Sequence, residues 1–365
     1  MTAARPPYRV PTMAEIAALP WNGFTTASTF SGCGGSSLGY RMAGYRVRWA
    51  SEFIPAAQDT YRANAAAYTV LDTRDIREVA AADVLAACGM AVGELDLLDG
   101  SPPCSPFSTT GNREAGWGEV KPYSGTRQRV DDLFFEYARL LRELQPRTFV
   151  AENVSGLVKG TAKGYFLEIL AALKACGYRV EARLLDASRL GVPQSRQRLI
   201  FVGVREDLDM APAFPRPLPY QYTASEATNS LATPAGTTHD PETREDIDIS
   251  QFAAGEAWRA TPPGSSSERY FSLSRSHPDQ PSRTITAESS GPHRASGVTH
   301  WAEPRKFTLP ELRRLGGFPD DFQLTGTYAQ RAERIGRAVP PVMMGHIAAA
   351  VRDQVLYPLR ERGVI

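Results

Sequence analysis

The fold is decided by the stretch Asp99-Gly100-Ser101-Pro102-Pro103-Cys104-Ser105-Pro106-Phe107-Ser108. The apolar residues 95–98, which include one aspartate, precede it and indicate a buried strand. Asp99-Gly100 is a turn pair that ends this strand, and two prolines then stiffen the backbone before Cys104. In open α/β sheets, ligands bind where the parallel strands end. A lone cysteine in a proline-rich turn is ordinarily a half-buried thiol without a function, so its meaning depends on the sequence on either side.

Four further motifs flank this stretch: Phe30-Ser31-Gly32-Cys33-Gly34-Gly35, Glu152-Asn153-Val154, Gln194-Ser195-Arg196-Gln197-Arg198 and Gly336-Arg337-Ala338-Val339-Pro340-Pro341. Each is weak alone, but five motifs in order form a specific pattern. Together they resemble the cytosine-C5 DNA methyltransferases, over about residues 27–204 and 283–352. One position departs from that family, because Gly336-Arg337 stands where the family usually has Gly-Asn.

Composition limits the possible classes of protein. The chain has 365 residues, 42% of them hydrophobic and 22% charged, which is enough for about two domains with a sizeable core. The formal net charge is +1, so a nucleic-acid surface would have to come from local clustering. Four scattered cysteines without a CxxC pair argue against a zinc site or a disulfide framework and predict a reducing cytoplasm. We expect neither a signal peptide nor a membrane span.

Strand and helix patterns alternate along the chain, which predicts a doubly wound, Rossmann-like α/β sheet. Strands are predicted at 27–31, 46–51, 69–71, 95–98 and 147–151, with a hairpin-like pair at the sheet edge from 178–185 and 198–204. Helices are predicted at 14–19, 36–42, 55–67, 130–144, 165–176, 308–315 and 341–359, the last packing back beside the first motif. A turn is predicted at 336–341.

Residues 205–300 differ from the rest in composition. They are rich in Pro, Ser, Thr and Gly with weak periodicity, and they lie between two of the motifs. We interpret them as a smaller, loop-rich target-recognition domain, with an ordinary insertion as the alternative. The catalytic domain would then be discontinuous, formed by residues 1–204 and 301–365.

The glycine-rich turn after the first strand is typical of dinucleotide-type ligand loops, where the backbone approaches a ligand near a helix N-terminus. Glu52 ends the second strand and suits a ribose diol. The resemblance implies that the ligand is S-adenosylmethionine. Its implied contacts are Phe30, Gly32, Cys33, Gly35, Glu52, Phe53, Asp75, Ile76, Pro103, Leu133, Arg337, Ala338 and Val339. The competing interpretations are a glycine turn that serves packing only, a solvated Glu52 and a helix N-cap at Asp75.

The resemblance also implies the chemistry. Cys104 would add as a thiolate to carbon 6 of a flipped-out cytosine, which activates carbon 5 toward the methyl donor. Glu152 would bond ring N3, and Arg198 would hold the exocyclic oxygen with Arg196 nearby. Asn153 and Gln194 would support this geometry. Gln194, Arg196 and Arg198 alternate, so we expect their side chains to share a face.

The expected partner is double-stranded DNA, with residues 109–125 as the loop that fills the place of the flipped base. We expect no metal, a monomer, and a cytoplasmic enzyme of a bacterial or phage modification system. The alternatives are a tRNA cytosine-C5 methyltransferase on the same fold and a non-catalytic DNA-binding relative.

The departure at Arg337 suggests an alternative donor. By resemblance this position lies near the donor, and a guanidinium there would favour a transferred group that carries a carboxylate. Carboxy-S-adenosylmethionine would then be used to make 5-carboxymethylcytosine. The competing interpretation is that Arg337 contacts a DNA phosphate or the donor's methionine carboxylate, and that methyl transfer is unchanged.

Overall fold

A computed structural model describes residues 5–103, 121–123, 126–128, 132–158, 163–231, 236–270, 272–287 and 297–365. Cys104 and most of the predicted loop 109–125 therefore lie outside the described residues. The chain divides into two compact units. Unit 1 contains the N-terminal residues through Ala18, Asp186–Arg196 and Pro217–Met343, and unit 2 contains Leu19–Leu185, Gln197–Arg216 and Met344–Ile365.

A seven-stranded sheet forms the centre of unit 2, in the order β3-β2-β1-β4-β7-β10-β8. The strands are β1 (Thr25–Thr29), β2 (Arg46–Ser51), β3 (Val70–Asp72), β4 (Leu97–Gly100), β7 (Thr148–Val154), β8 (Tyr178–Asp186) and β10 (Gln197–Arg205). β1 is parallel to both β2 and β4, and β4 is parallel to β7, whereas β10 runs antiparallel to β7. The strand order reverses between β1 and β4, which makes this the topological switch point of the sheet.

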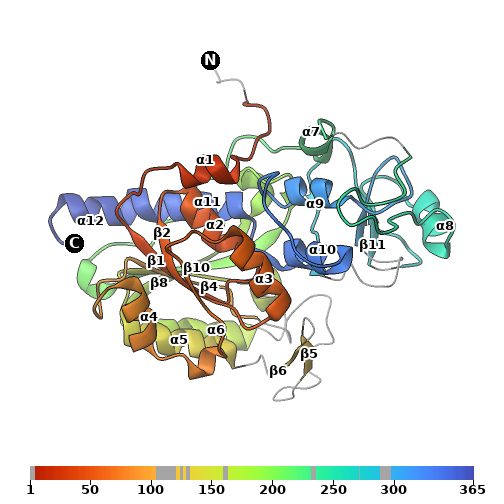
Figure 1. The fold of residues 1–365 in the computed structure, drawn as a ribbon. Coiled ribbons are helices and arrows are strands. Elements are labelled where there is room, and N and C mark those ends of the chain that lie inside the picture. Colours follow the sequence, from red (N-terminus) through yellow and green to blue (C-terminus); the bar gives the residue numbers. More distant parts are fainter. Residues whose placement is uncertain are drawn as a thin grey trace. The chain divides into compact units, whose positions relative to one another are not determined.

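Helices cover both faces of this sheet, as predicted. Figure 1 shows α4, α5 and α6 on one face and α2 and α11 on the other. The helices of unit 2 are α2 (Gly35–Met42), α3 (Pro55–Asn64), η1 (Ile76–Glu78), α4 (Ala81–Cys88), α5 (Leu133–Leu144), η3 (Ser155–Val158), α6 (Lys163–Lys174) and η6 (Glu206–Leu208). A short antiparallel pair, β5 (Lys121–Tyr123) with β6 (Thr126–Gln128), occurs at the end of the segment predicted as a loop. The doubly wound fold is confirmed.

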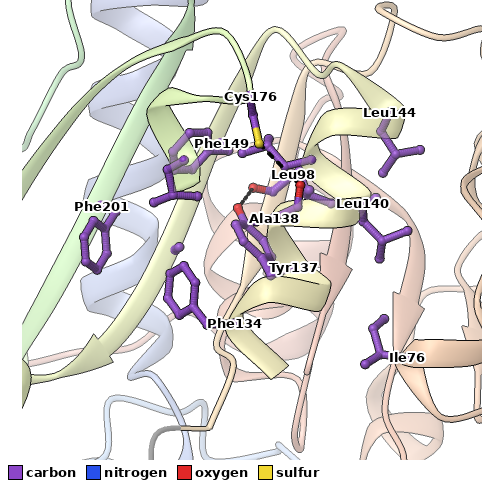
Figure 2. Packing of buried hydrophobic residues seen from close by; sticks show 14 of the residues in the cluster. Ile76, Leu98, Phe134, Tyr137, Ala138, Leu140, Leu144, Phe149, Cys176 and Phe201 are labelled. Atoms are coloured by element: carbon purple, nitrogen blue, oxygen red, sulfur yellow. Dashed lines mark hydrogen bonds between the residues drawn. The ribbon is translucent and has the colours of Figure 1, made fainter. Parts of the chain in front are cut away.

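Helix α5 supplies much of the core between the sheet and its helices (Figure 2). Its apolar residues recur at helical spacing, and seven of its twelve residues are buried. Tyr137 donates from its hydroxyl to the carbonyl of Leu98 on β4 at 3.1 Å. A Cβ atom at Gly100 would lie 2.5 Å from the Tyr137 ring, so only glycine fits where β4 passes into the Pro102-Pro103 turn. The core therefore fixes the start of that turn.

The C-terminal helix runs through α11 (Pro341–Val351), a π-helical turn (Arg352–Leu356) and α12 (Tyr357–Glu361). Within unit 2 it packs beside α2, because a Cβ at Gly345 would lie 3.6 Å from the Cβ of Met42. The Tyr45 hydroxyl also donates to the carbonyl of Ala348 at 3.1 Å. The expected return of this helix to the first motif is confirmed.

Unit 1 is loop-rich, with short helices and two-stranded pairs. Its elements are α1 (Met13–Ala17), η5 (Ala187–Leu190), β9 (Gln194–Ser195), α7 (Ala224–Thr228), α8 (Ala253–Ala260), β11 (Leu273–Arg275), β12 (Ser282–Arg283), β13 (Gly297–Thr299), α9 (Leu309–Leu315) and α10 (Tyr328–Arg337). β9 pairs with β12 and β11 with β13, both in parallel. Buried polar groups tie the loops to the helices: the Asp240 carboxylate accepts from the backbone N–H of Leu309 at 2.7 Å.

Two predicted turns are wrong in part. Asp99 and Gly100, predicted as a turn pair, are the last residues of β4, because both pair with β1 and β7 in the sheet. Gly336 and Arg337 are the last residues of α10, and the turn begins only at Ala338. The glycine serves a close approach here, because a Cβ at Gly336 would lie 2.4 Å from the carbonyl oxygen of Thr286. The sequence around Gly336 does not reveal such an approach, because Thr286 lies 50 residues away. The division into residues 1–204 plus 301–365 and 205–300 stays a proposal.

Candidate active site

The parallel strands of unit 2 bring the predicted motif residues to one edge of the sheet, because parallel strands end at the same edge. Phe30 follows β1, Glu52 follows β2, and Pro103 lies three residues after β4. Glu152 lies near the end of β7. The loops after β1 and β4 flank the switch point, where open α/β sheets bind their ligands.

The loop after β1 has an unusual backbone. Phe30 has a φ of 52°, a left-handed conformation that is costly for a non-glycine residue. Gly32 also has a positive φ, and a Cβ atom there would meet no heavy atom of the described residues within 4 Å. The backbone at Gly32 therefore faces open space, as a ligand-binding loop requires. This loop lies directly before α2, which begins at Gly35.

Glu52 holds the same loop in place. One of its carboxylate oxygens accepts from the backbone N–H of Gly32 at 2.7 Å, and the other accepts from Ile54 N–H at 2.7 Å. Each carboxylate oxygen has a second lone pair, so ribose hydroxyls can still donate to them. Phe53, the next residue, is an exposed aromatic ring, available to pack against a ligand.

The structure gives Asp75 the role of a helix N-cap. Its side chain accepts from the backbone N–H of Arg77 at 3.0 Å at the start of η1. Arg77 in turn forms ion pairs with Asp75 at 2.9 Å and with Asp132 at 2.7 Å. The capping alternative is therefore confirmed, and a contact with adenine stays a prediction. Cys33, Ile76 and Leu133 are also buried in unit 2.

Glu152 and Arg198 form the most direct pair in the site. Arg198 Nε lies 2.7 Å from Glu152 Oε1, and both side chains are largely buried, at 14% and 12% exposure. The pair forms because β7 and β10 are antiparallel with Ile200 opposite Glu152, which places Arg198 diagonally on the same face. Burial lowers the pKa of Arg198, and the negative charge of Glu152 opposes that shift.

The neighbouring Asn153 is 2% exposed, and its Oδ1 accepts from Val154 N–H at 2.8 Å. Its Nδ2 is buried and finds no hydrogen-bond partner within the described part of the chain. A buried amide donor of this kind ordinarily has a partner. This agrees with a supporting role for Asn153 toward a substrate or the adjoining turn.

The expectation that Gln194, Arg196 and Arg198 share one face holds for the first two, because the Gln194 Oε1 accepts from the N–H of Ile285 at 3.1 Å and Arg196 contacts the same residue. Arg198 follows in a different strand, since β9 ends at Ser195 and β10 begins at Gln197. Arg196 lies between them in unit 1, is 2% exposed, and donates to the carbonyls of Ile285 at 2.9 Å and Gly336 at 2.8 Å. The Gln194 amide donates to the carbonyl of Leu315 at 3.1 Å. Arg196 and Gln194 therefore organise backbone within unit 1, whereas Arg198 pairs with Glu152 in unit 2.

The last three predicted cofactor residues belong to unit 1. Arg337 ends α10, followed by Ala338 and by the buried Val339. Arg337 Nε lies 2.7 Å from Glu333 Oε1 one helical turn earlier, and its side chain is one-third exposed. The guanidinium thus has a carboxylate partner on its own helix.

Sequence reasoning missed one buried group at this edge. Asp99, next to last in β4, accepts hydrogen bonds from the hydroxyls of Ser28 at 2.7 Å and Tyr40 at 3.2 Å. Burial raises the pKa of Asp99 to about 7. The available signal was a carboxylate at the end of an apolar strand, directly before the proline turn.

Among the described residues, no helix is long and apolar enough to cross a membrane. No group of three or more His, Cys, Asp or Glu side chains among them is placed to hold a metal ion.

The proteins that this chain resembles are methyltransferases. The family profile of the C-5 cytosine-specific DNA methylases matches residues 24–353. The Type II methyltransferase M.NgoFVII of Neisseria gonorrhoeae is 30% identical over 345 residues, 89% of this chain and 85% of that protein. M.SacI of Streptomyces achromogenes is 32% identical over 350 residues, 87% of this chain and 86% of that protein.

Among solved structures, a chain assigned as a DNA modification methyltransferase encoded within an E. coli prophage has a TM-score of 0.71. It is 21% identical, and the match covers 92% of this chain and all of the other. The S. pombe Dnmt2 methyltransferase has a TM-score of 0.57 at 18% identity, covering 92% and 99%. These similarities support the fold, and the profile match spans most of the chain. The chain therefore belongs to the C-5 cytosine-specific DNA methylase family.

Proposed function

We propose that this protein transfers a methyl group from S-adenosylmethionine to carbon 5 of a flipped cytosine in duplex DNA, through a covalent adduct with Cys104. The observation that carries the proposal is the Glu152–Arg198 pair, a carboxylate and a guanidinium 2.7 Å apart on adjacent strands. The pair lies on the two strands that follow β4 in the sheet order. A cytosine ring needs this combination of groups at N3 and at its exocyclic oxygen.

The donor loop fits the proposed donor. The backbone at Gly32 is open enough for a ligand to approach it. The Glu52 carboxylate could accept hydrogen bonds from the ribose, and the exposed Phe53 ring offers an apolar surface. Asp75, Ile76, Pro103 and Leu133 would complete the donor site in unit 2, and Ala338 and Val339 stay predicted donor contacts. When bound, S-adenosylmethionine supplies an electrophilic methyl group.

The residues of the chain would do the remaining chemistry on the cytosine. The Cys104 thiolate forms a bond to carbon 6 while Glu152 gives a proton to N3, so the ring electron pair becomes available at carbon 5. After carbon 5 has gained the methyl group, loss of the carbon 5 proton to solvent, return of the N3 proton to Glu152 and breakage of the C6–S bond restore the aromatic ring and the thiolate. Arg198 holds Glu152 and the exocyclic oxygen, and Arg196 acts as a positioning residue through Gly336.

Residues 205–300 would select the DNA sequence, and the target base would leave the helix to reach the site. The relatives named as Type II methyltransferases support a role in a restriction-modification system. We propose a monomer that acts in the cytoplasm of a bacterial host. Transfer to tRNA and DNA binding without catalysis are the alternatives that the following experiment separates.

The test is transfer of a tritiated methyl group from S-adenosylmethionine to DNA and to tRNA, by the wild-type protein and by Cys104→Ser. We expect label in DNA only, with loss of transfer but retained DNA binding in the variant. Duplex DNA containing 5-fluorocytosine should trap the wild-type protein covalently, because carbon 5 then has no proton to lose. Label in tRNA alone, or turnover by the variant within about tenfold of wild type, would contradict the proposal.

The alternative donor, carboxy-S-adenosylmethionine, rests on the guanidinium of Arg337 at a position where the family has a neutral amide. The Glu333 pair weakens this case, since the charge already has a partner on α10. Mass spectrometry of nucleosides from DNA incubated with both donors in equal amounts decides between them. Formation of 5-carboxymethylcytosine that Arg337→Asn abolishes would support the alternative, and 5-methylcytosine alone in both proteins would end it.

A further inference from the structure

Asp99 occupies the switch point of the sheet but belongs to none of the proposed catalytic or donor-binding groups. It pairs with Ser28 of β1 in parallel register and with Val150 of β7 on the other side. Its side chain is fully buried, and both carboxylate oxygens accept hydroxyl donors, from Ser28 at 2.7 Å and Tyr40 at 3.2 Å. The Ser31 hydroxyl donates a hydrogen bond to the Ser28 hydroxyl oxygen at 3.0 Å. The carboxyl group is therefore built into the base of the loop that precedes Gly32.

No Arg or Lys of the described residues forms an ion pair with this carboxyl group. Among the described residues, the titratable groups whose charges act on Asp99 come from four elements, and none of them is a cation: Tyr40 on α2, Tyr61 on α3, Tyr137 on α5 and Glu152 on β7. Glu152 itself is paired with Arg198. Burial and the negative charge of Glu152 raise the pKa of Asp99 to about 7, against the opposing effect of its hydroxyl donors. An isolated buried charge is costly without a partner of opposite sign.

We propose that the missing countercharge is the sulfonium of the methyl donor, and that Asp99 distinguishes the cationic donor from the neutral product. This inference rests on the proposed function. Asp99 is ionised when the donor is bound, having released its proton to solvent. Transfer of the methyl group converts the sulfonium to an uncharged thioether, after which Asp99 takes a proton back from solvent and the product is no longer held by charge. Asp99 acts here as a positioning and specificity residue and forms no bond to the reacting atoms.

The expected change in donor affinity is large enough to measure. A cation one or two strand spacings from an ionised carboxylate, roughly 5–10 Å, gains about tenfold or more in affinity at an effective dielectric constant of about 20. With Asp99 titrating at about 7, the ionised fraction rises from about one-tenth at pH 6 to about nine-tenths at pH 8. Donor affinity should therefore increase with pH over this range, whereas product affinity should not.

The experiment is isothermal titration calorimetry of the full-length protein with S-adenosylmethionine and, separately, S-adenosylhomocysteine at pH 6, 7 and 8. We expect the Kd of the donor to fall by about tenfold from pH 6 to pH 8. At pH 7, buffers of different ionisation enthalpy should report release of about half a proton per donor bound. The Kd of the product should change by less than about twofold. These measurements need no variant, so they stand whether or not a substitution at Asp99 folds.

Two variants complete the test. Asp99→Asn keeps the shape without the charge, and its donor affinity should match wild type at pH 6 but be weaker at pH 8. Glu181→Gln removes an exposed carboxylate of the same sheet, on edge strand β8, and should leave both pH profiles unchanged. The amino group of the donor titrates near this range, so the decisive quantity is the difference between wild type and Asp99→Asn.

The outcomes separate this inference from the proposed function. Donor binding whose pH dependence is the same in wild type and in folded Asp99→Asn would overturn the role of Asp99 and leave methyl transfer intact. Equal pH dependence for donor and product would also overturn it. Failure of either ligand to bind would instead contradict the proposed function.

Discussion

The Glu152–Arg198 pair shows how one residue's role depends on its neighbour. Arg198 holds Glu152 through Nε, so the carboxylate has one defined orientation in a site with little exposed surface. A lysine cannot reproduce this contact, because it offers a point charge on a flexible stem in place of a planar fork. The orientation of Glu152 is therefore set before any substrate binds.

We predict that Glu152→Gln slows the covalent step by about 10²- to 10⁴-fold, because glutamine cannot give a proton to N3. DNA affinity should change far less. The measurement is the rate of adduct formation on 5-fluorocytosine DNA beside the equilibrium Kd for unmodified DNA, with Glu181→Gln as the exposed control. Equal losses in rate and affinity would assign Glu152 a purely structural role.

His300 gives unit 1 a pH-dependent stability. Its Nδ1 accepts from the backbone N–H groups of Ala302 and Glu303, each at 3.2 Å, so protonation of this nitrogen removes both bonds. Burial lowers the pKa of His300 from its usual 6.5 to about 4. Since the unfolded chain binds this proton more readily, the free energy of unfolding falls as the pH drops from about 6.5 to about 4, by up to about 3 kcal/mol.

The check is chemical denaturation at several pH values in this window. His300→Asn retains an acceptor without titrating, so we expect a shallower loss of stability on acidification than in wild type. The exposed His239 provides the control, since His239→Asn should keep the wild-type slope. An unchanged slope in His300→Asn would show that other groups cause the acid sensitivity.

At the scale of elements, helix α9 combines a cap with an ion pair. Thr308 and Glu311 form a capping box, and the same Glu311 carboxylate binds Arg305 through two bonds at 2.8 and 2.9 Å. Both side chains of this ion pair are 4% exposed. Arg305 also pairs with Glu303 at 2.6 Å, so loss of Glu311 would leave the buried guanidinium with one carboxylate in place of two. The start of α9 therefore depends on more than helix propensity.

We predict that Glu311→Ala lowers the free energy of unfolding by about 2–4 kcal/mol, measured by urea denaturation, because it removes two charged hydrogen bonds to Arg305 and the capping box. Helix α10 offers a matched control, because Thr327 and Gln330 form the same capping box at an exposed position. Gln330→Ala should cost no more than about 1 kcal/mol. Similar losses in the two variants would mean that the cap, and not the buried ion pair, sets the stability of α9.

At the scale of the whole molecule, both compact units are discontinuous, and the chain passes between them at five points. Asp186–Arg196 belongs with Pro217–Met343, although composition changes only after residue 205. β9 and β12 explain this, because Gln194 pairs with Ser282 across a long stretch of sequence. A transplanted recognition segment must therefore bring compatible partners for β9 and for the Asp240 contact with Leu309.

We predict that exchanging residues 205–300 for the matching segment of a relative with a different site moves methylation to that relative's site. The chemistry should be unchanged, because Cys104, Glu152 and Arg198 lie outside the exchanged segment. Base-resolution mapping of modified cytosines in DNA from an expressing host measures the outcome. A segment from a relative with the same site is the control for folding. Methylation that stays at the original site after the first exchange would refute the assignment.

The sequence by itself determined the family, the order of the motifs and the alternation of strands and helices. It also predicted the start of α9 correctly, from Thr308, Pro310 and Glu311. These features are local, since caps, turns and hydrophobic periods act within a few residues, and the order of the motifs can be read directly. They were enough to place Glu52, Pro103 and Glu152 at the ends of strands, and hence at one edge of a sheet.

Only the tertiary structure decided which side chains meet. The bond between Ser28 and Asp99 joins residues 71 positions apart, and nothing near Asp99 in the sequence shows that its carboxyl group is buried without a cation. The same holds for Arg196, whose carbonyl partners lie 89 and 140 residues away, while Arg198 two positions on binds Glu152. Spacing sets the direction of a side chain along one strand. Its partner, burial and charge state depend on elements that packing brings together from distant parts of the chain.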